Sequence, residues 1–144
     1  MNKRYKFILA LSIVLVIAII AIIYIPRMKT SVENVLFDHI DKKEITEIRI
    51  SKSPDYQDVI VKDKKVIDEL ISSFSEIKIR KSRINKFEEA YWIIIRIGNG
   101  KSYLINLYDN NSIAIYNPDK TKNKLNTYKI ISEYDLDPIR QLIR

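Results

Sequence analysis

The feature that most constrains this chain is an uninterrupted apolar run near its start. Residues 7–25 read FILALSIVLVIAIIAIIYI, nineteen positions without a charged side chain. As an α-helix they would extend about 28 Å at 1.5 Å per residue, close to the ~30 Å hydrocarbon core of a bilayer. The alternative, a helix buried in a soluble core, would have to be apolar on every face for about five turns. The run therefore predicts a membrane-spanning helix.

Three kinds of N-terminal segment share such a run: a lipoprotein signal, a cleaved signal peptide and an uncleaved anchor. A lipoprotein signal needs a cysteine to carry the lipid, and the chain contains none. A cleaved signal peptide has an apolar core of about 7–15 residues followed by small residues in an A-x-A-like pattern. Here Ala18 and Ala21 are spaced one residue too far apart for that pattern, and the run ends in bulky residues. These features favour an uncleaved anchor, with Tyr24 at the level of the headgroups.

Positive charge is denser before the apolar run than after it. Before the run stand Lys3, Arg4 and Lys6, whereas Arg27 and Lys29 after it are soon balanced by acidic residues. Such an excess predicts an N-terminus inside the cytoplasm. The expected layout in a bacterial cell membrane is a cytoplasmic tail at 1–6, a transmembrane helix at 7–25, a short connection at 26–30 and an extracytoplasmic domain at 31–144.

The net charge of +7 belongs mostly to the flanks of the predicted membrane helix. Without the five basic residues of these flanks, 20 basic and 18 acidic residues remain, a net charge of +2. A nearly neutral domain lacks the basic footprint that binding to a phosphate backbone requires. Nucleic acid is therefore not an expected partner. The absence of cysteine also excludes disulfides, thiolate metal sites and a cysteine nucleophile.

Periodicity predicts an α+β domain after the anchor, with a single antiparallel sheet and helices packed on one face. Thr30 and Glu33 match a capping box that would start a helix over 31–39. Asp63 would cap a helix over 64–75, whose apolar residues recur at spacings of three and four. Asp137 would cap a last helix, with Pro138 at its first position. Strands are expected over 46–50, 56–61, from 77 onward, 91–97, 103–107, 112–116 and 125–131.

Two of these strands carry further expectations. Residues 91–97 (YWIIIRI) are apolar at both odd and even positions, so both sides of a strand would be apolar. This predicts a central strand covered on both sides or nearly so. The Asn99-Gly100 pair that follows predicts a type I′ hairpin turn, because both central positions of that turn need a positive φ.

The densest charge cluster outside the flanks comprises Lys78, Arg80, Lys81, Arg83 and Lys86. Charge at inward-facing positions indicates that the strand leaves the sheet there or lies on an edge, where charge discourages edge pairing. The same cluster is a candidate patch for an anionic partner such as lipid headgroups, wall polymers or an acidic protein surface.

Aromatic residues gather on neighbouring predicted strands: Tyr91, Trp92, Tyr103, Tyr108, Tyr116 and Tyr128. The favoured interpretation is an ordinary sheet interior, and the alternative is a protein-recognition surface.

Other polar groups have ordinary structural interpretations. His39 is the chain's single histidine and has no second metal ligand or nucleophile motif nearby. Glu88 and Glu89 are neighbours in a loop and would point apart on a strand. The run 109–112 lacks the glycine and distal glutamate of a calcium loop and is typical of a hairpin turn. No catalytic residue, metal ligand or cofactor is expected.

The pattern as a whole resembles a known group of proteins. An N-terminal anchor is followed by LFDHIDKKEITEIRI over 36–50, by VKDKKVI over 61–67 and by a meander rich in tyrosine and isoleucine. This arrangement resembles small membrane-anchored extracytoplasmic proteins of unknown function from Firmicutes, over most of the chain. It contains no site motif, so the resemblance implies no functional residue.

The sequence thus predicts a membrane-anchored binding module rather than an enzyme. Its partners would be the bilayer, through residues 7–25, and an envelope protein or anionic polymer, in a sensor, accessory or immunity-type role. An alternative is a small subunit of a membrane complex that makes its contact through the helix, although the helix has no GxxxG motif. An envelope enzyme is the weaker alternative, because no motif of convergent polar residues is present.

The predicted topology has a direct test. Protease added to intact bacterial cells that produce the chain should digest residues 31–144 and leave the membrane helix with its short tail. A cytoplasmic protein that stays intact in the same sample would show that the cells are sealed. Digestion only after the cells are permeabilised would reverse the orientation.

Overall fold

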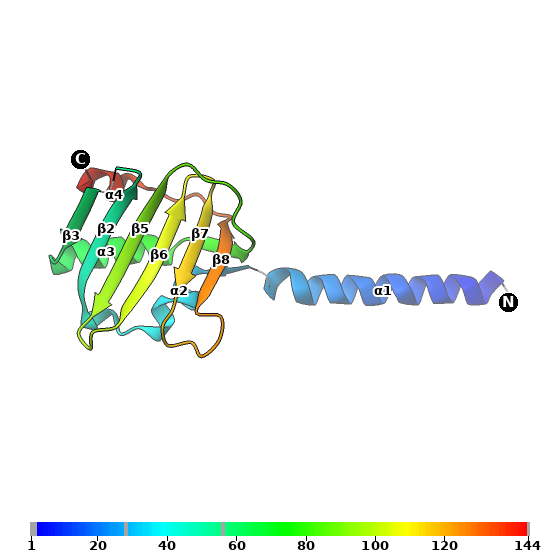
Figure 1. Cartoon of the computed structure of the whole chain (residues 1–144). Helices are drawn as coiled ribbons and strands as arrows, with labels where there is room; N and C mark the ends of the chain where they lie inside the picture. The colour runs from blue at the N-terminus through cyan, green and yellow to red at the C-terminus, as the bar shows by residue number, and fades with distance from the viewer. Residues whose placement is uncertain (1–2, 28, 56, 144) are drawn as a thin grey trace.

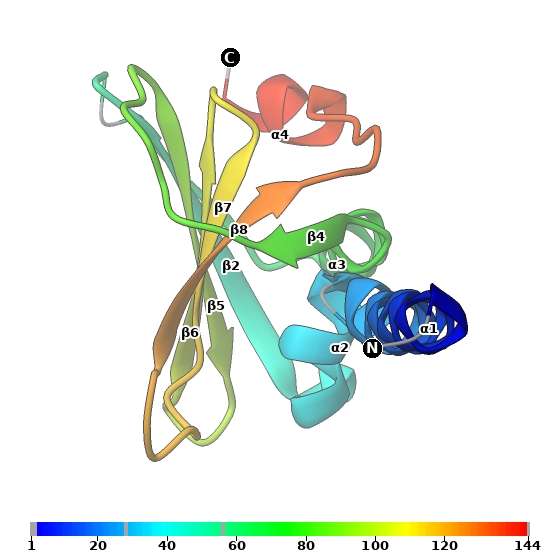
Figure 2. The same cartoon turned by 90° about the vertical axis from the view of Figure 1, so that its right-hand side faces the viewer.

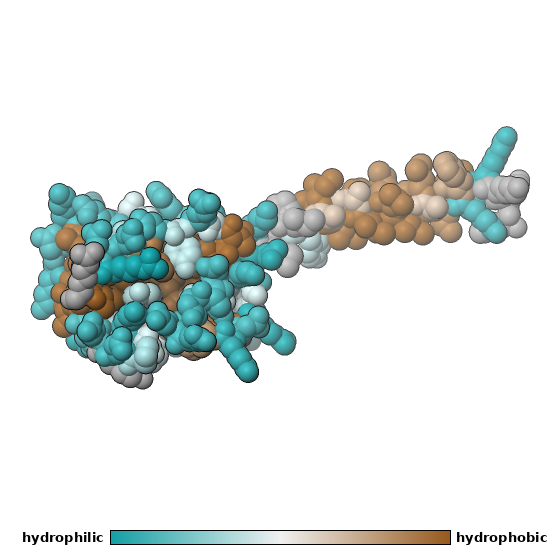
Figure 3. All heavy atoms as spheres, turned by 90° about the horizontal axis from the view of Figure 1, so that it is seen from above, coloured by the Kyte–Doolittle hydropathy of each residue, from teal (hydrophilic) through white to brown (hydrophobic). Residues whose placement is uncertain are grey.

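A long exposed helix precedes a compact sheet domain. The computed structural model describes residues 3–27, 29–55 and 57–143. Helix α1 (Lys3–Arg27) extends away from one edge of the sheet (Figure 1). Its Arg4–Tyr24 stretch is long and apolar enough to cross a membrane, and none of it is buried against the domain. Figure 3 shows a nearly continuous hydrophobic surface along this helix, next to a mostly hydrophilic domain.

The domain is built on one antiparallel sheet with the strand order β1-β4-β8-β7-β6-β5-β2-β3. Both of its outermost strands, β1 and β3, are short, which limits the unpaired backbone that the sheet presents to other chains. The strands are β1 (Lys29–Ser31), β2 (Ile45–Ser53), β3 (Gln57–Val61), β4 (Lys78–Lys81), β5 (Ala90–Ile97), β6 (Ser102–Tyr108), β7 (Ser112–Tyr116) and β8 (Leu125–Ile130).

Helices cover one face of this sheet and leave the other without a helical layer, as Figure 2 shows in side view. The predicted fold class, an α+β domain with helices on one face of a single antiparallel sheet, is confirmed. The covering elements are α2 (Val32–Val35), α3 (Lys64–Ser75), α4 (Asp137–Leu142) and the short 3-10 turns at Phe37–His39 and Lys42–Glu44.

Helix α3 is the main element of the covering layer. It begins where predicted, because the Asp63 carboxylate accepts a hydrogen bond from the backbone N–H of Val66 at 3.1 Å. Its buried residues lie on one stripe that faces the sheet: Ile67, Leu70, Ile71 and Phe74. Full burial of such a side chain contributes roughly 1.5–3 kcal/mol. This stripe therefore fixes which sheet face becomes the core.

Strand β5 is central, as predicted, but it is covered on one face only. Ile93 and Ile95 are fully buried under the helices, whereas Trp92 on the opposite face is 43% exposed. The prediction of cover on both sides is therefore wrong. The apolar side chains at even positions of β5, Trp92 and Ile94, point to the other face of the sheet, where the described residues provide no second layer.

The start of the domain also differs from the sequence prediction. Residues 29–31 form strand β1 and pair with β4, with Thr30 opposite Ile79. Ser31, not Thr30, caps α2, and its Oγ accepts a hydrogen bond from the Asn34 N–H at 3.3 Å. The predicted Thr30–Glu33 capping box is wrong, and helix α2, which replaces the helix expected over 31–39, is only four residues long. A three-residue strand is too short for a periodic pattern, so the sequence gives no sign of it.

Two turns also form differently. In the β5–β6 hairpin Gly100 has a positive φ of 84°, and Asn99 does not. The Gly100 N–H donates to the Ile97 carbonyl at 3.0 Å, which fits a turn followed by one left-handed residue rather than type I′. At α4, Leu136 is the N-cap residue instead of Asp137. The Asp135 carboxylate accepts the Asp137 N–H at 2.8 Å.

The α3–sheet contact makes a stability prediction. Leu70→Ala should lower the free energy of unfolding by about 2–5 kcal/mol, because Leu70 is 2% exposed and the change leaves a cavity. Its neighbour offers the control: Glu69→Ala, at an exposed position, should change it by less than about 0.5 kcal/mol. Urea titration of the detergent-solubilised chain, followed by the fluorescence of Trp92, measures both values. Equal effects would contradict the assignment of this helix face to the core.

Candidate interaction surface

The sheet face opposite the helices is called the open face below. The odd-numbered residues of β2 and the even-numbered residues of β3, β5, β6 and β7 point to it. Its apolar members are Ile60, Trp92, Ile94, Leu104, Tyr108, Ala114 and Tyr116, and Leu125 of β8 joins them. Several are well exposed: Leu125 by 58%, Ile60 by 48% and Trp92 by 43%. Isolated exposed apolar residues are normal, but a contiguous set marks an interaction site.

Six directly opposed residues of the open face form a continuous row across the sheet. The row, called the open-face row below, runs across six strands as Ile60, Arg49, Ile94, Leu104, Tyr116 and Leu125. Directly opposed side chains have Cβ atoms about 4.5–5.5 Å apart and contact one another. The row therefore makes one band over most of the width of the sheet, rather than scattered apolar spots.

Polar groups within this band are only partly satisfied. Nε of Arg49 is buried and has no hydrogen-bond partner in the described structure, and the same holds for Oδ1 of Asn106. Beside the band, on β5 and β2, Arg96 pairs with Glu47 at 3.4 Å. A buried polar group without a partner costs about 1–3 kcal/mol. A bound surface that supplied an acceptor to Arg49 would recover part of that cost.

One edge of the open face is covered by the chain itself. The segment 82–89 crosses from β4 to β5, and the Phe87 ring lies 4.3 Å from the Tyr108 ring, centre to centre. Thr127 donates a hydrogen bond from its hydroxyl to the Ser82 carbonyl at 2.5 Å, which fixes the start of the segment. No other described segment covers the rest of the face, around Ile94 and Leu104, in this way.

The predicted aromatic cluster is divided between the two faces. Trp92, Tyr108 and Tyr116 lie on the open face, while Tyr103 and Tyr128 are buried on the helix-covered side. Tyr91 packs at the border of the core and accepts a hydrogen bond from Arg140. The two interpretations of these residues, recognition surface and sheet interior, thus each fit one half of them.

The predicted basic cluster is also divided. Lys78, Arg80 and Lys81 lie on β4, which ends at Lys81 and so leaves the sheet there, as predicted. The alternative expectation of an edge position is wrong, because β4 lies between β1 and β8. Arg83 and Lys86 follow on the 82–89 segment.

That segment runs toward the β6–β7 turn. Asn110 at this turn donates from its side-chain amide to the Lys86 carbonyl at 2.9 Å. All five cluster residues are exposed.

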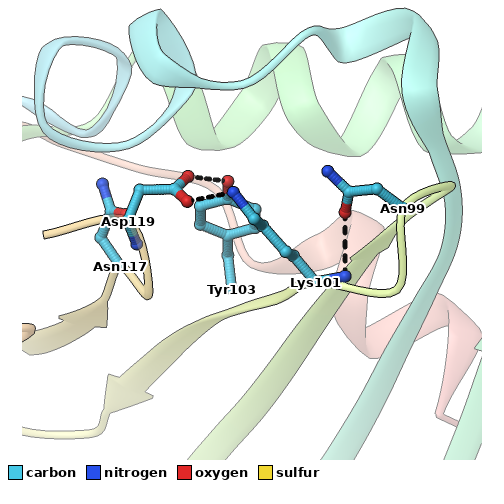
Figure 4. Close-up of polar contacts among 5 residues, drawn as sticks. All are labelled: Asn99, Lys101, Tyr103, Asn117 and Asp119. Atoms are coloured by element: carbon cyan, nitrogen blue, oxygen red, sulfur yellow. Dashed lines mark hydrogen bonds and ion pairs between the residues drawn. The ribbon is translucent and has the colours of Figure 1, made fainter.

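A polar cluster that sequence reasoning missed ties the β7–β8 loop to β6 (Figure 4). The Tyr103 hydroxyl and the Lys101 ammonium both donate to the carboxylate of Asp119. Asn117, which is buried, accepts the Asp119 N–H at 3.0 Å and holds the carboxylate in place. The sequence shows turn residues around Pro118, but nothing in it indicates which strand they would contact.

These contacts shift the ionisation of both partners. Burial, and then the hydrogen bond to Asp119, raise the pKa of Tyr103 to about 12. Lys101 and then Tyr103 lower the pKa of Asp119. The Tyr103 contribution to stability is present below its ordinary pKa of about 10 and is lost as the pH rises toward 12. The Asp119 contribution is present above about pH 4 and is lost as the pH falls through its lowered pKa.

The other polar residues singled out in the sequence have structural positions. His39 is exposed and lies beside Asp119 at a shallow depression. Glu89 pairs with Lys52 at 3.7 Å, and Glu88 is exposed in the 82–89 segment. The 109–112 run forms the β6–β7 turn, as predicted, with Asn111 at a φ of 58°. Within the described ranges, no group of three or more histidine or acidic side chains could hold a metal ion.

A cavity of about 340 Å³ lies between α4 and the ends of β5 and β6. Its polar groups bind the protein's own backbone and side chains. Asp109 accepts the N–H groups of residues 88–89 at 3.1 Å, and Asp135 accepts an N–H of α4 at 2.8 Å. Arg140 donates to Tyr91 across the cavity wall. The Arg140–Tyr91 contact fastens α4 to β5, whereas the Asp109 bonds tie residues 88–89 to the end of β6 and the Asp135 bond caps α4.

Comparison with known proteins adds no homologue: no protein-family model, no curated protein and no solved structure matches the chain. Function is therefore argued from the chain's own surfaces. Among these, the open-face row is an organised feature that extends over six strands and that the fold itself does not use.

The Asp119 cluster predicts a specific change in tyrosine titration. Asp119→Asn removes the negative charge next to the phenol and should lower the pKa of Tyr103 from about 12, while burial keeps it above its ordinary value. Alkaline titration of tyrosinate absorbance measures this change, and Tyr103→Phe assigns the transition. Asp55→Asn, at an exposed position, is the matched control and should leave the curve unchanged. Identical curves for Asp119→Asn and the wild type would contradict the assigned contact.

Proposed function

We propose that this protein is a single-pass, membrane-anchored extracytoplasmic binding module whose open face takes a protein partner. α1 holds the domain at the bilayer, with the N-terminus inside and the sheet domain outside the cytoplasm. The observation that carries the proposal is the open-face row, a band of apolar side chains across six strands with one arginine among them.

The mixture of side chains favours a protein over a polymer. Four of the six residues in the row are aliphatic: Ile60, Ile94, Leu104 and Leu125. Aliphatic side chains gain from burial against another apolar surface. A tyrosine and a tryptophan beside them fit the composition of interface centres. A hydrated polyanion offers no apolar surface to this band.

Arg49 defines what the partner should present. Its guanidinium interrupts the apolar row, and Nε lacks an acceptor. A carboxylate or carbonyl in the bound surface would meet that need with a charge-assisted hydrogen bond, worth about 1.5–3 kcal/mol. The partner is therefore a protein with an apolar surface and an acceptor group near its middle.

The anchor directs this face toward neighbours in the membrane plane. α1 leaves the sheet from its β1 edge (Figure 1), so strands β4 to β3 follow at increasing distance from the bilayer. A sheet that stands on its edge presents its open face sideways. Such a face suits another envelope protein, in the sensor, accessory or immunity-type roles that the sequence suggests.

Site-specific photocrosslinking in living cells tests the proposal. A photoreactive amino acid at Ile60 or Leu125 should give discrete protein adducts, because both side chains are well exposed on the open face. The same residue at Lys65 or Glu69, exposed positions on α3, should give none. Arg49→Ala in the Leu125 background should reduce the adduct by an order of magnitude or more, about the factor of a binding hot spot.

Each other outcome has a defined meaning. Adducts of equal yield from the α3 positions would contradict recognition by the open face. Adducts only from a position within α1, such as Ile13, would support the alternative in which the helix itself contacts a membrane complex. Arg49→Ala should leave the urea transition within about 0.5–1 kcal/mol of the wild type, which separates lost binding from lost folding.

A further inference from the structure

We propose that the sheet edge next to α1 docks on anionic phospholipid headgroups of the membrane that α1 enters. The contact would be made by a row of cations, called the basic row below, that comprises Lys29 of β1, Arg80 of β4 and Lys129 of β8. Of these, only Arg80 belongs to the cluster visible in the sequence.

Strand pairing creates the basic row. Lys29 is directly opposite Arg80, and Arg80 is directly opposite Lys129. Opposed side chains in an antiparallel pair point to the same face. The three residues are separated by about 50 positions in sequence at each step, yet they lie on three adjacent strands within about 10 Å, two strand spacings. Lys78 lies two residues before Arg80 on the same strand, so its side chain points to the same face.

Such a row works against folding unless an anion is close. Like charges directly opposite each other destabilise a strand pair, and here two successive pairs carry them. The ion pairs of the described residues involve other cations, and none includes Lys29, Arg80 or Lys129. All three side chains are exposed. A layer of negative charge outside the protein would offset this repulsion.

The short path from α1 identifies that layer as lipid. The apolar stretch ends at Tyr24 and helix α1 ends at Arg27, so the last helical residues rise only about 5 Å above the stretch. Lys29 follows within about 7 Å of extended chain. The headgroup region beyond the hydrocarbon core is itself several ångströms thick. The basic row therefore begins near the headgroups, whereas a wall polymer or soluble protein would have to enter this gap.

Docking would also set the direction of the open face. The basic row points to the same side of the sheet as the open face and lies at the β1 edge. Its contact with lipid would therefore tilt the open face toward the membrane at that edge. Strand β3 lies seven strand spacings away, about 34 Å from β1, and stays clear of the surface. The lipid contact would thus stabilise one orientation of the open face in the membrane plane.

Lysine labelling of the full chain in nanodiscs tests this inference. Discs of phosphatidylcholine alone are compared with discs that also contain phosphatidylglycerol, and amine acylation is followed by mass spectrometry. Lys29, Lys78 and Lys129 should react roughly fivefold more slowly in the anionic discs, the factor that one cation near such a surface is worth. Lys43 and Lys65, exposed and away from the basic row, should react equally in both. High salt should remove the difference.

A matched pair of double variants separates charge position from net charge. Arg80→Gln with Lys129→Gln should abolish the protection of Lys29 and Lys78. Lys43→Gln with Lys65→Gln loses the same charge elsewhere and should retain the protection. Both variants should keep the wild-type circular dichroism spectrum, since all four positions are exposed.

Three outcomes would overturn the inference. Equal labelling in the two kinds of disc excludes docking on anionic lipid. Equal protection in both kinds indicates steric shielding by the disc rather than headgroup charge. Protection in neutral discs only after addition of soluble polyphosphate assigns the row to an anionic polymer.

The inference rests on the membrane anchoring in the proposed function, not on the partner of the open face. A chain that fails to enter the discs would contradict the anchor itself. A chain that enters the discs without protection of the basic row would contradict only the docking.

Discussion

The apolar contact between α3 and the sheet is the interaction on which the rest of the domain depends. Its stripe of buried residues packs on the same sheet face as Ile93 and Ile95. Since the helices of the domain lie on that one face, the opposite face keeps its apolar side chains exposed. The same packing therefore creates the core and leaves the surface that we propose for binding. It also explains why β5 is apolar at both parities without being buried on both sides.

The two proposed contacts divide the sheet by position. The open-face row lies over the centre, where apolar residues of six strands are opposed. The basic row lies at the edge that adjoins α1, where three strands bring cations together. Apolar burial would supply affinity for a protein, whereas screened charge attraction would supply orientation at a lipid surface. The two proposals are compatible, because α1, the proposed anchor, leaves the sheet at the edge that carries the basic row.

Local signals predicted the elements well where periodicity or capping was strong. The Asp63 cap and the apolar stripe gave α3 its bounds, and strands β2, β3 and β5 to β8 formed where local patterns predicted them. Short or context-dependent elements were not predictable. Strand β1 is held by backbone pairing with β4, and Asn99 did not adopt the positive φ that its dipeptide favours. The candidate sites followed the same division: the β4 cations were visible in sequence, but their neighbours Lys29 and Lys129 were not.

The sequence alone determined the membrane-suited helix, the α+β class and the near-neutral charge of the domain. Each of these follows from composition or from a period within a single segment. Only the tertiary structure decided which face of the sheet stays open, that Arg49 lies within an apolar row, and that three distant cations are adjacent. These properties depend on strand order and register, which arise from contacts between segments far apart in the chain. No local pattern encodes them, because the alternation of apolar and polar residues along a strand does not say which strand will pair with it or in what register.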